Sequence, residues 1–410
     1  MRLRIAALLA CALSAAPVYS QTTPLSRAVA VQTALERGAR LGVPGADTAV
    51  ARAALTTARA LPNPNLTGSY SKSVPQYHVG FDIPIGLPRR RSLAVQSATY
   101  ALQASELRYQ FARASVALDA DTTYTRAVAA REHLALSRRA ALDADSILHM
   151  AERRRDAGDA SELDVALARV AAGQQANIAA ADSLTYFSVV LDLEATLGIT
   201  TPAGQVEPTD SLTEPPAAVV PAQTLNEAAA GLSVQSAAVA IRHEQRSIFS
   251  SPIVSFGFEY GDPTRAEPGI LPTFGLGLAL PLFDRNRGGI AQAEAEHARA
   301  MAELTLARVD ARNQVNHATR ERNAALARVT RDRLLVTSAN SVANMALVSY
   351  REGASTLPNV LEAQRTARDV LSNYIDDLAS AWIATAELRA LATPVPPVAA
   401  GTQPPPGSNP

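Results

Sequence analysis

The residues able to do acid–base, metal or nucleophilic chemistry are scattered through this sequence. No two histidines stand three or four residues apart, the spacing that would place them on one helix face as zinc or copper ligands. There is no phosphate-binding glycine loop and no nucleophile elbow, and helix surfaces account for the many acidic residues. The sequence therefore predicts no enzyme, no cofactor and no resident metal. The six histidines are His78, His133, His149, His243, His297 and His317.

The N-terminal residues have the pattern of a secretory signal peptide. Arg2 and Arg4 form a short basic head, and the apolar run Ile5–Ala16 is too short to span a bilayer. Val18–Ser20 then offers a cleavage site before Gln21. We expect residues 1–20 to be removed on export.

The only cysteine of the chain, Cys11, lies inside this signal. Leu8–Cys11 resembles a lipoprotein cleavage box, which is the alternative reading. A cysteine in the signal core is favoured, because the apolar run before Cys11 is short and continues beyond it. The mature protein would then contain no thiol and no disulfide.

Composition excludes some functions. The 410 residues include 38 basic and 38 acidic side chains, so there is no basic surface for nucleic acid. Alanine is abundant while tryptophan occurs once, which is typical of long, closely packed helices. Beyond the signal no run of 18 apolar residues occurs, so a role in a bilayer would have to come from β-strands.

Two pairs of segments, at about 65–85 and about 253–282, alternate between apolar and polar or small residues. This period of two predicts strands with one apolar face, and each run is long enough to cross a bilayer when tilted. Aromatic residues gather on the apolar faces, as a lipid-facing surface requires; the alternative is a pair of soluble hairpins packed on helices. The apolar positions are Leu66, Tyr70, Tyr77, Val79, Phe81, Ile83, Val254, Phe256, Phe258, Tyr260, Phe274, Leu276, Leu278 and Leu280.

Four strands cannot close a barrel, for which about eight is the practical minimum. Open strand edges in lipid are very unfavourable. If the strands span a membrane, several copies of the chain must therefore share one barrel.

The rest of the chain is predicted to be helical. Helices are expected from about Leu25 to Leu61, with a loop near Gly42–Asp47, and from about 223 to 249. Pro88–Ala157 would form a helix of about 105 Å, too long for a globular core and suited to a coiled-coil-like wall. Further helices are expected at 161–197, from about Gly289 onward, and up to Leu391.

Two turns between the long helices carry capping residues. Gly158 can end the first long helix in a left-handed conformation, and Ser161 with Asp164 can cap the next helix. Gly353 and Ser355 or Thr356 can do the same in the second half of the chain, where Pro358 suits a first helical turn.

The strands and turns recur at a nearly constant offset, which indicates an internal duplication. Ile83–Ile85 corresponds to Leu280–Leu282, and Gly158–Ser161 corresponds to Gly353–Thr356. We expect a first repeat at 21–200 with a tip near 158–164, a Pro-rich linker at 201–222, and a second repeat at 223–392 with a tip near 353–359. The Pro-rich tail, 393–410, is predicted to be disordered.

Basic residues follow a strand of each repeat at equivalent places. Their recurrence favours anchoring at the inner headgroup layer over simple solvated helix starts. These residues are Arg89, Arg90, Arg91, Arg285 and Arg287.

Four stretches resemble the TolC family of outer-membrane efflux proteins. They are Leu280-Pro-Leu-Phe-Asp-Arg-Asn-Arg-Gly-Gly-Ile-Ala, Tyr350-Arg-Glu-Gly-Ala-Ser-Thr-Leu-Pro-Asn-Val-Leu, Ala157-Gly-Asp-Ala-Ser-Glu-Leu-Asp-Val and Ala60-Leu-Pro-Asn-Pro-Asn-Leu. Within the family the chain is most similar to the cation-efflux (CzcC/CusC-like) branch. The resemblance implies a mainly helical fold with a small β part: a homotrimer whose twelve strands form one barrel and whose long helices form a periplasmic tunnel.

The resemblance also implies partners and site residues. A periplasmic membrane-fusion adaptor and an inner-membrane RND-type pump would deliver metal cations to the channel; drugs or secreted protein are the alternative cargo. Tyr350 and Asp164 match a gate pair and Glu362 an acidic ring position. Asn359 and Ser355 stand where other members carry an acid and an arginine. Residues expected to contact the adaptor are Gly158, Ser161, Leu163, Gly353, Ser355, Thr356 and Leu357.

A periplasmic coiled-coil scaffold is the competing reading from a different class. The four amphipathic segments argue against it, because a scaffold needs no such strands.

Overall fold

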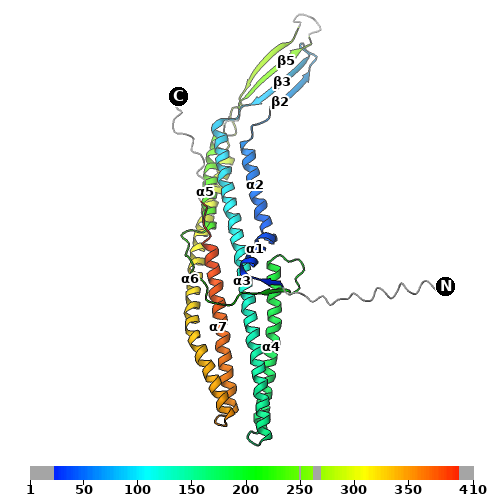
Figure 1. Ribbon diagram of the computed structural model, residues 1–410. Coiled ribbons are helices and arrows are strands. Elements are labelled where there is room, and N and C mark those ends of the chain that lie inside the picture. The colour runs from blue at the N-terminus through cyan, green and yellow to red at the C-terminus, as the bar shows by residue number, and fades with distance from the viewer. Residues whose placement is uncertain (1–22, 249–250, 262–268, 397–410) are drawn as a thin grey trace, which may run out of the picture. The chain divides into compact units, whose positions relative to one another are not determined.

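The computed structural model describes residues 23–248, 251–261 and 269–396. The predicted signal peptide and residues 397–410 of the tail lie outside them. The fold is mainly helical with a small sheet part, as predicted (Figure 1). In chain order the elements are β1 (Thr23–Leu25), α1 (Arg27–Arg37), a 3-10 turn (Ala39–Leu41), α2 (Gly42–Arg59), β2 (Asn65–Tyr70), β3 (Tyr77–Pro84), α3 (Pro88–Asp156), α4 (Glu162–Thr196), β4 (Val206–Pro208), α5 (Leu225–Arg246), β5 (Ile253–Tyr260), β6 (Leu271–Gly277), α6 (Arg287–Arg351) and α7 (Leu357–Leu391).

The two longest helices are uninterrupted because their sequences contain no residue that would break them. α3 has 69 residues, with no glycine and with proline only at its first position, where a missing N–H does no harm. α6 has 65 residues, and its two glycines fall in its first turn. α4 and α7 have 35 residues each. The predicted long helices and the helical hairpins of both halves are confirmed.

No described helix combines the length and the apolar character that are needed to span a membrane.

The four predicted strands form one antiparallel sheet in the order β2-β3-β5-β6. The register places apolar residues opposite apolar ones and polar residues opposite polar ones: Val79 faces Phe258, and His78 faces Glu259. The predicted end of the last strand was wrong. β6 ends at Gly277, which lies opposite the first residue of β5. Leu278 and Leu280, predicted as strand positions, lie beyond it.

The beginning of the chain differs from the sequence prediction. The loop expected at 42–47 is the start of α2, and the break lies earlier, at Gly38 and the 3-10 turn. Pro44 fits here because a helix tolerates proline in its first turn. Leu25, expected to begin a helix, lies in β1, which pairs in parallel with β4 inside the Pro-rich linker. α5 is also shorter than expected.

The chain divides into two compact units, and each unit contains segments of both repeats. Unit 1 comprises Met1–Ala39, Val116–Ala218 and Ala318–Ala390, and unit 2 comprises Arg40–Ser115, Val219–His317 and Leu391–Pro410. The apolar cluster at the tips belongs to unit 1. Unit 2 contains the sheet and a second cluster, which α3 and α5 form around Leu107 and Leu232.

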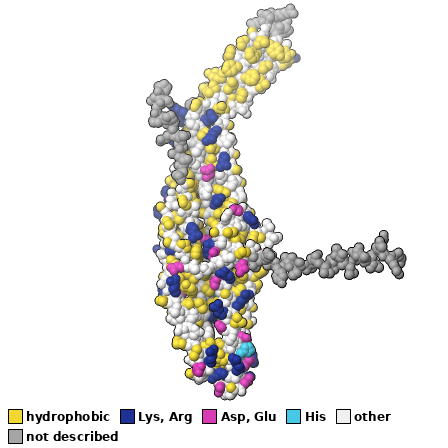
Figure 2. All heavy atoms as spheres, viewed as in Figure 1, with side chains coloured by type: hydrophobic (Ala, Val, Ile, Leu, Met, Phe, Trp, Pro, Cys, Tyr) yellow, Lys and Arg dark blue, Asp and Glu magenta, His cyan; other side chains and the backbone are white. Residues whose placement is uncertain are grey.

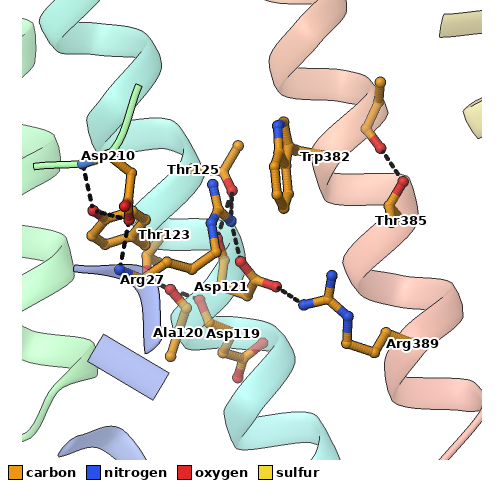
Figure 3. Close-up of polar contacts among 12 residues, drawn as sticks. Arg27, Asp119, Ala120, Asp121, Thr123, Thr125, Asp210, Trp382, Thr385 and Arg389 are labelled. Carbon is orange, nitrogen blue, oxygen red and sulfur yellow. Dashed lines mark hydrogen bonds and ion pairs between the residues drawn. The ribbon is translucent and has the colours of Figure 1, made fainter. Parts of the chain in front are cut away.

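A polar network in unit 1 attaches the N-terminal segment and the linker to α3 and α7 (Figure 3). Arg27 donates to the buried carboxylate of Asp121, which Arg389 also contacts at 3.2 Å. The Arg27 guanidinium lies over the ring of Trp382 at 4.0 Å. The Arg27 backbone N–H donates to Asp210 at 2.7 Å, and the Tyr124 hydroxyl donates to the same oxygen.

Burial of this network shifts two pKa values. Burial chiefly raises the pKa of Tyr124, and its hydrogen bond to Asp210 adds to the rise. Burial alone would also raise the pKa of Asp210, but hydrogen bonds from Tyr124 and the Arg27 backbone outweigh it and hold that pKa below its ordinary value. Asp210 therefore remains an acceptor in the network at neutral pH.

Candidate functional site: the helical tips and the strand bases

Both turns between the long helices of unit 1 have the same geometry. Gly158 and Gly353 have φ of +87° and +77°, in the left-handed region that glycine adopts most easily. Gly158 N–H donates to the Arg155 carbonyl, and Asp159 N–H donates to the Arg154 carbonyl. In the second turn, the N–H groups of Gly353 and of the residue after it donate to the equivalent two carbonyls at the end of α6. This is the Schellman arrangement, which satisfies the last carbonyls of a helix. The prediction that these glycines form the turns at the ends of the two long helices is confirmed.

The start of α4 is a complete capping box. Ser161 Oγ accepts from the Asp164 N–H at 3.1 Å, and Asp164 Oδ2 accepts from the Ser161 N–H at 3.0 Å. The carboxylate also suits the positive end of the helix dipole. At the other tip the amide of Asn359 lies 3.4 Å from Ser355 Oγ, a longer and weaker contact.

The two tips pack on one apolar cluster to which all four helices contribute. Tyr350 of α6 is 3 % exposed and lies among residues of the other three helices. Because the two hairpins share this core, a change in Tyr350 affects both. The buried members are Ile147, Ala151, Val165, Ala168, Tyr350, Leu357 and Val360.

Arg154 joins the end of α3 to Tyr350. Its guanidinium lies 4.7 Å from the centre of the Tyr350 ring and donates to the Tyr350 carbonyl oxygen. Such a contact contributes about 0.5–2 kcal/mol, depending on burial. Sequence reasoning missed Arg154, since it stands in the run Arg153–Arg155 and nothing in the spacing distinguishes it.

The Tyr350 hydroxyl is buried without a hydrogen-bond partner among the described residues. Burial is the main cause that raises the Tyr350 pKa; the positive charge of Arg154 lowers it, and the carboxylate of Asp164 raises it. Within one protomer, Asp164 is bonded to Ser161 instead. The structure therefore places both members of the predicted gate pair at the tips without a hydrogen bond between them.

The other predicted tip residues fall into exposed and buried groups. Glu362 and Asn359 are exposed on α7, and Leu163 is 66 % exposed on α4. Leu357 is different, because its side chain is buried in the tip cluster. It cannot offer that side chain to an adaptor in this structure.

Glu362 lines a groove of about 780 Å³ between the two hairpins of unit 1. The groove mixes charged residues, among them Arg139 and Arg368, with apolar ones such as Leu167 and Leu371. Because Ile147 of the tip cluster and Pro358 of the second turn also line it, the groove belongs to the same candidate surface.

The predicted basic residues lie where strands lead into long helices. Arg89, Arg90 and Arg91 occupy the first turn of α3, and Arg287 is the first residue of α6. Positive charge opposes the dipole at a helix N-terminus, so helix stability does not explain these residues. Arg91 donates to the carbonyl of Arg59 at the end of α2.

Asn286, just before α6, connects this junction to the end of α5. It has φ 55°, which asparagine tolerates better than most residues. Its side-chain amide donates to the Glu244 carboxylate at 2.7 Å and to the Glu244 carbonyl at 3.0 Å. This amide is the main cause that lowers the pKa of Glu244.

We expect Asn286→Gly to weaken this junction, because glycine keeps the backbone conformation and removes only the side-chain bonds. The loss should be about 2.5–4 kcal/mol, given about 1 kcal/mol for an ordinary hydrogen bond and about 1.5–3 for one to a charged group. Urea unfolding in detergent would measure it. Wild-type stability in Asn286→Gly would show that the connection between α5 and α6 does not depend on this side chain.

The comparisons with known proteins agree with this architecture. Residues 264–393, less than half of the chain, match the family model described as outer membrane efflux protein. None of the curated proteins compared with the chain matches it.

Solved structures cover most of the chain. The outer membrane protein VceC from Vibrio cholerae superposes with a TM-score of 0.75 at 18 % identity, covering 89 % of this chain and 96 % of that one. A membrane protein from Pseudomonas aeruginosa gives 0.73 at 21 % identity, covering 89 % and 93 %. CusC gives 0.73 at 16 % identity, covering 89 % of this chain and 91 % of that one.

The chain is thus similar to outer-membrane efflux proteins by its family model and by its structural neighbours, and its fold is that of TolC-type channels. The likeness to CusC is no greater than the likeness to VceC. It does not single out the metal-efflux branch.

Proposed function

We propose that this protein is an outer-membrane channel, the exit duct of a tripartite efflux system, and that it catalyses no reaction. In this proposal the sheet crosses the outer membrane and the long helices extend into the periplasm. A periplasmic adaptor docks at the tips, and an inner-membrane pump, of RND type, supplies the energy. The channel conducts passively.

The observation that carries the proposal is that the aromatic residues of the sheet lie on one face, whereas its acidic residues and its histidine lie on the other. Tyr77 faces Tyr260 and Phe81 faces Phe256 on one side, whereas His78 faces Glu259 on the other. The apolar side is exposed; Phe274 and Leu276 are each 77 % accessible. Figure 2 shows hydrophobic side chains gathered over the strands. A soluble hairpin pair would cover this face, whereas lipid provides its natural environment.

The proposed oligomer follows from the strand order. β2 and β6 are the outer strands of the described sheet, and each is paired on one side only. Unpaired edges cannot remain open in lipid, and one sheet of four strands cannot close on itself. A ring of identical copies, each joining its β6 to the next β2, satisfies every edge. We propose three copies and twelve strands, as the resemblance to the TolC family implies.

The oligomer is tested on protein from the outer-membrane fraction. Native mass measurement in detergent should give three chains for each particle. A monomer that stays in the soluble periplasmic fraction would contradict the proposal and favour the coiled-coil scaffold.

For cargo we propose metal cations, with organic drugs or secreted protein as the alternative for the same fold. The support is chemical: the charged side chains of the described strands are acidic, apart from His78. An acidic lining attracts cations and repels anions. Resistance to metal salts, compared with resistance to organic drugs in a deletion strain, would separate the two cargoes.

We also propose Tyr350 and Asp164 as part of a gate at the tips. Support comes from the unpartnered Tyr350 hydroxyl and from the effect of Asp164 on its pKa. Replacing both, with Asp164→Ala and Tyr350→Phe, should raise single-channel conductance in planar bilayers, since the Tyr350 hydroxyl of one copy could then form no hydrogen bond with the Asp164 carboxylate of a neighbouring copy. Unchanged currents would remove this pair from the gate.

A further inference from the structure

The described strands of the sheet carry three ionisable residues on their polar face: His78, Asp82 and Glu259. Residues 78 and 82 of β3 have the same alternation parity, and the register places Glu259 directly opposite His78. The other face has apolar pairs at the neighbouring positions, such as Val79 with Phe258. No lysine or arginine occurs in the described strands β2, β3, β5 and β6.

Contacts hold each carboxylate on this face. His78 Nδ1 lies 3.1 Å from Glu259 Oε1, and the Ser255 hydroxyl donates to Asp82 Oδ1 at 2.5 Å. Both contacts cross from β3 to β5, so the two strands fix the acidic side chains between them.

A polar hollow separates the two contacts. Gly80 faces Gly257 at its floor, and its volume is about 230 Å³. A Cβ on Gly257 would come within 2.6 Å of Thr273 Oγ1 and 2.9 Å of the Val79 carbonyl oxygen. The hollow therefore depends on glycine, and hydroxyl groups of Thr67, Ser255 and Thr273 line it. Hydroxyl and carboxylate oxygens are the ligands that hard, hydrated cations prefer.

We infer that Asp82 and Glu259 determine the ion selectivity of the pore. Hydrated cations would bind weakly and briefly at this polar face of the sheet as they pass. The inference rests on the proposed function, because only a sheet closed with other copies turns its polar face to a lumen. Two carboxylates in each of three copies give six negative charges, with no lysine or arginine from the described strands among them. Weak binding in an open hollow suits conduction, since an ion must enter and also leave.

The expected size of the effect follows from Coulomb attraction in water. Three charges at about 10 Å from a permeating ion, screened over a Debye length of about 10 Å, should change the cation-to-anion permeability ratio about three- to fivefold for each ring. Neutralising both rings should therefore abolish most of the selectivity.

The experiment measures reversal potentials across a planar bilayer in a KCl gradient at one fixed pH. The full-length trimer should be cation-selective, Asp82→Asn and Glu259→Gln should each reduce the permeability ratio about three- to fivefold, and the double variant should be nearly unselective. Glu36→Gln is the matched control: it removes one negative charge from an exposed position on α1, far along the chain from the strands, and should leave the ratio unchanged.

The possible outcomes distinguish a failure of the inferred selectivity from a failure of the proposed channel function. Channels whose wild-type current is anion-selective, or whose selectivity survives in the double variant, would overturn the inference and leave the proposed channel intact. Wild-type protein that forms no channels at all would overturn both.

Discussion

Replacing Tyr350 with alanine should release the tips of unit 1, with a loss of about 3–5 kcal/mol in local stability, as for other large-to-small core changes. The residue is 3 % exposed and belongs to the tip cluster, to which all four helices contribute. Its removal also deprives Arg154 of the aromatic face 4.7 Å from its guanidinium. Four helix ends depend on this one side chain, so the effect should extend to both turns.

Tyr350→Phe should behave differently. The hydroxyl is buried without a partner among the described residues, and leaving a buried hydroxyl unpaired costs roughly 1–3 kcal/mol. Phenylalanine keeps the ring and removes that cost, so local stability should be unchanged or slightly higher. A gating effect of Tyr350→Phe can then be read without a folding defect.

Hydrogen exchange of the amides around Gly158 and Gly353 is the suitable measurement, because it reports local opening. Tyr350→Ala should lose protection at both turns, whereas Tyr109→Ala, which removes a half-buried tyrosine of unit 2, should keep it. Loss of protection at only one turn would show that the tips do not share a core.

Replacing Glu194 with alanine should destabilise the linker between the repeats by at least about 4 kcal/mol. Four backbone N–H donors would lose their acceptor, at roughly 1–3 kcal/mol for each one left unpaired. Glu194 is 2 % exposed at the end of α4. Its two carboxylate oxygens accept from the backbone N–H groups of four successive residues, 203–206, at 2.6–3.1 Å. These bonds shape the loop that leads into β4.

The same group should make unit 1 sensitive to acid. Burial alone would raise the Glu194 pKa, but the four N–H donors outweigh burial and hold the pKa below its ordinary value of 4.5. A carboxyl with a depressed folded-state pKa contributes its full stability above the unfolded-state pKa. That contribution is lost as the pH falls below about 4.5 and through the folded-state pKa.

Thermal unfolding of wild type and Glu194→Ala from pH 7 to pH 3 would test this. The difference in melting temperature should be largest at pH 7 and should shrink below about pH 4.5. Glu207→Gln changes an exposed acid of the neighbouring β4 and serves as the control, with no expected change. A pH-independent difference would mean that the charge of Glu194 is not what holds the loop.

The parts of the fold that depend on local patterns were predictable. Three local patterns agreed with the final structure. α3 has no glycine and no proline after its first residue, a glycine stands at each tip, and apolar and polar residues alternate along β3 and β5. Ser161 and Asp164 formed the expected capping box because both partners lie within one turn.

The parts that depend on distant contacts were not predictable. Arg27 and Asp121 are 94 positions apart, and Arg154 and Tyr350 are 196 apart; arginine is common in this chain, so no spacing singles out these two. β1 and β4 have three residues each, too few to show an alternation. Leu357 was expected to contact the adaptor only because of the resemblance to the TolC family, yet its side chain is buried in the tip cluster.

The proposal that this chain forms a membrane pore is tested most directly by single-channel recording. Protein without residues 1–20 would be purified in detergent and added to a planar bilayer. Discrete, reproducible current steps from a particle of three chains are the expected result. A protein that folds and remains stable but never inserts or conducts would contradict the proposal, because the exposed apolar face of the sheet would then serve some purpose other than contact with lipid.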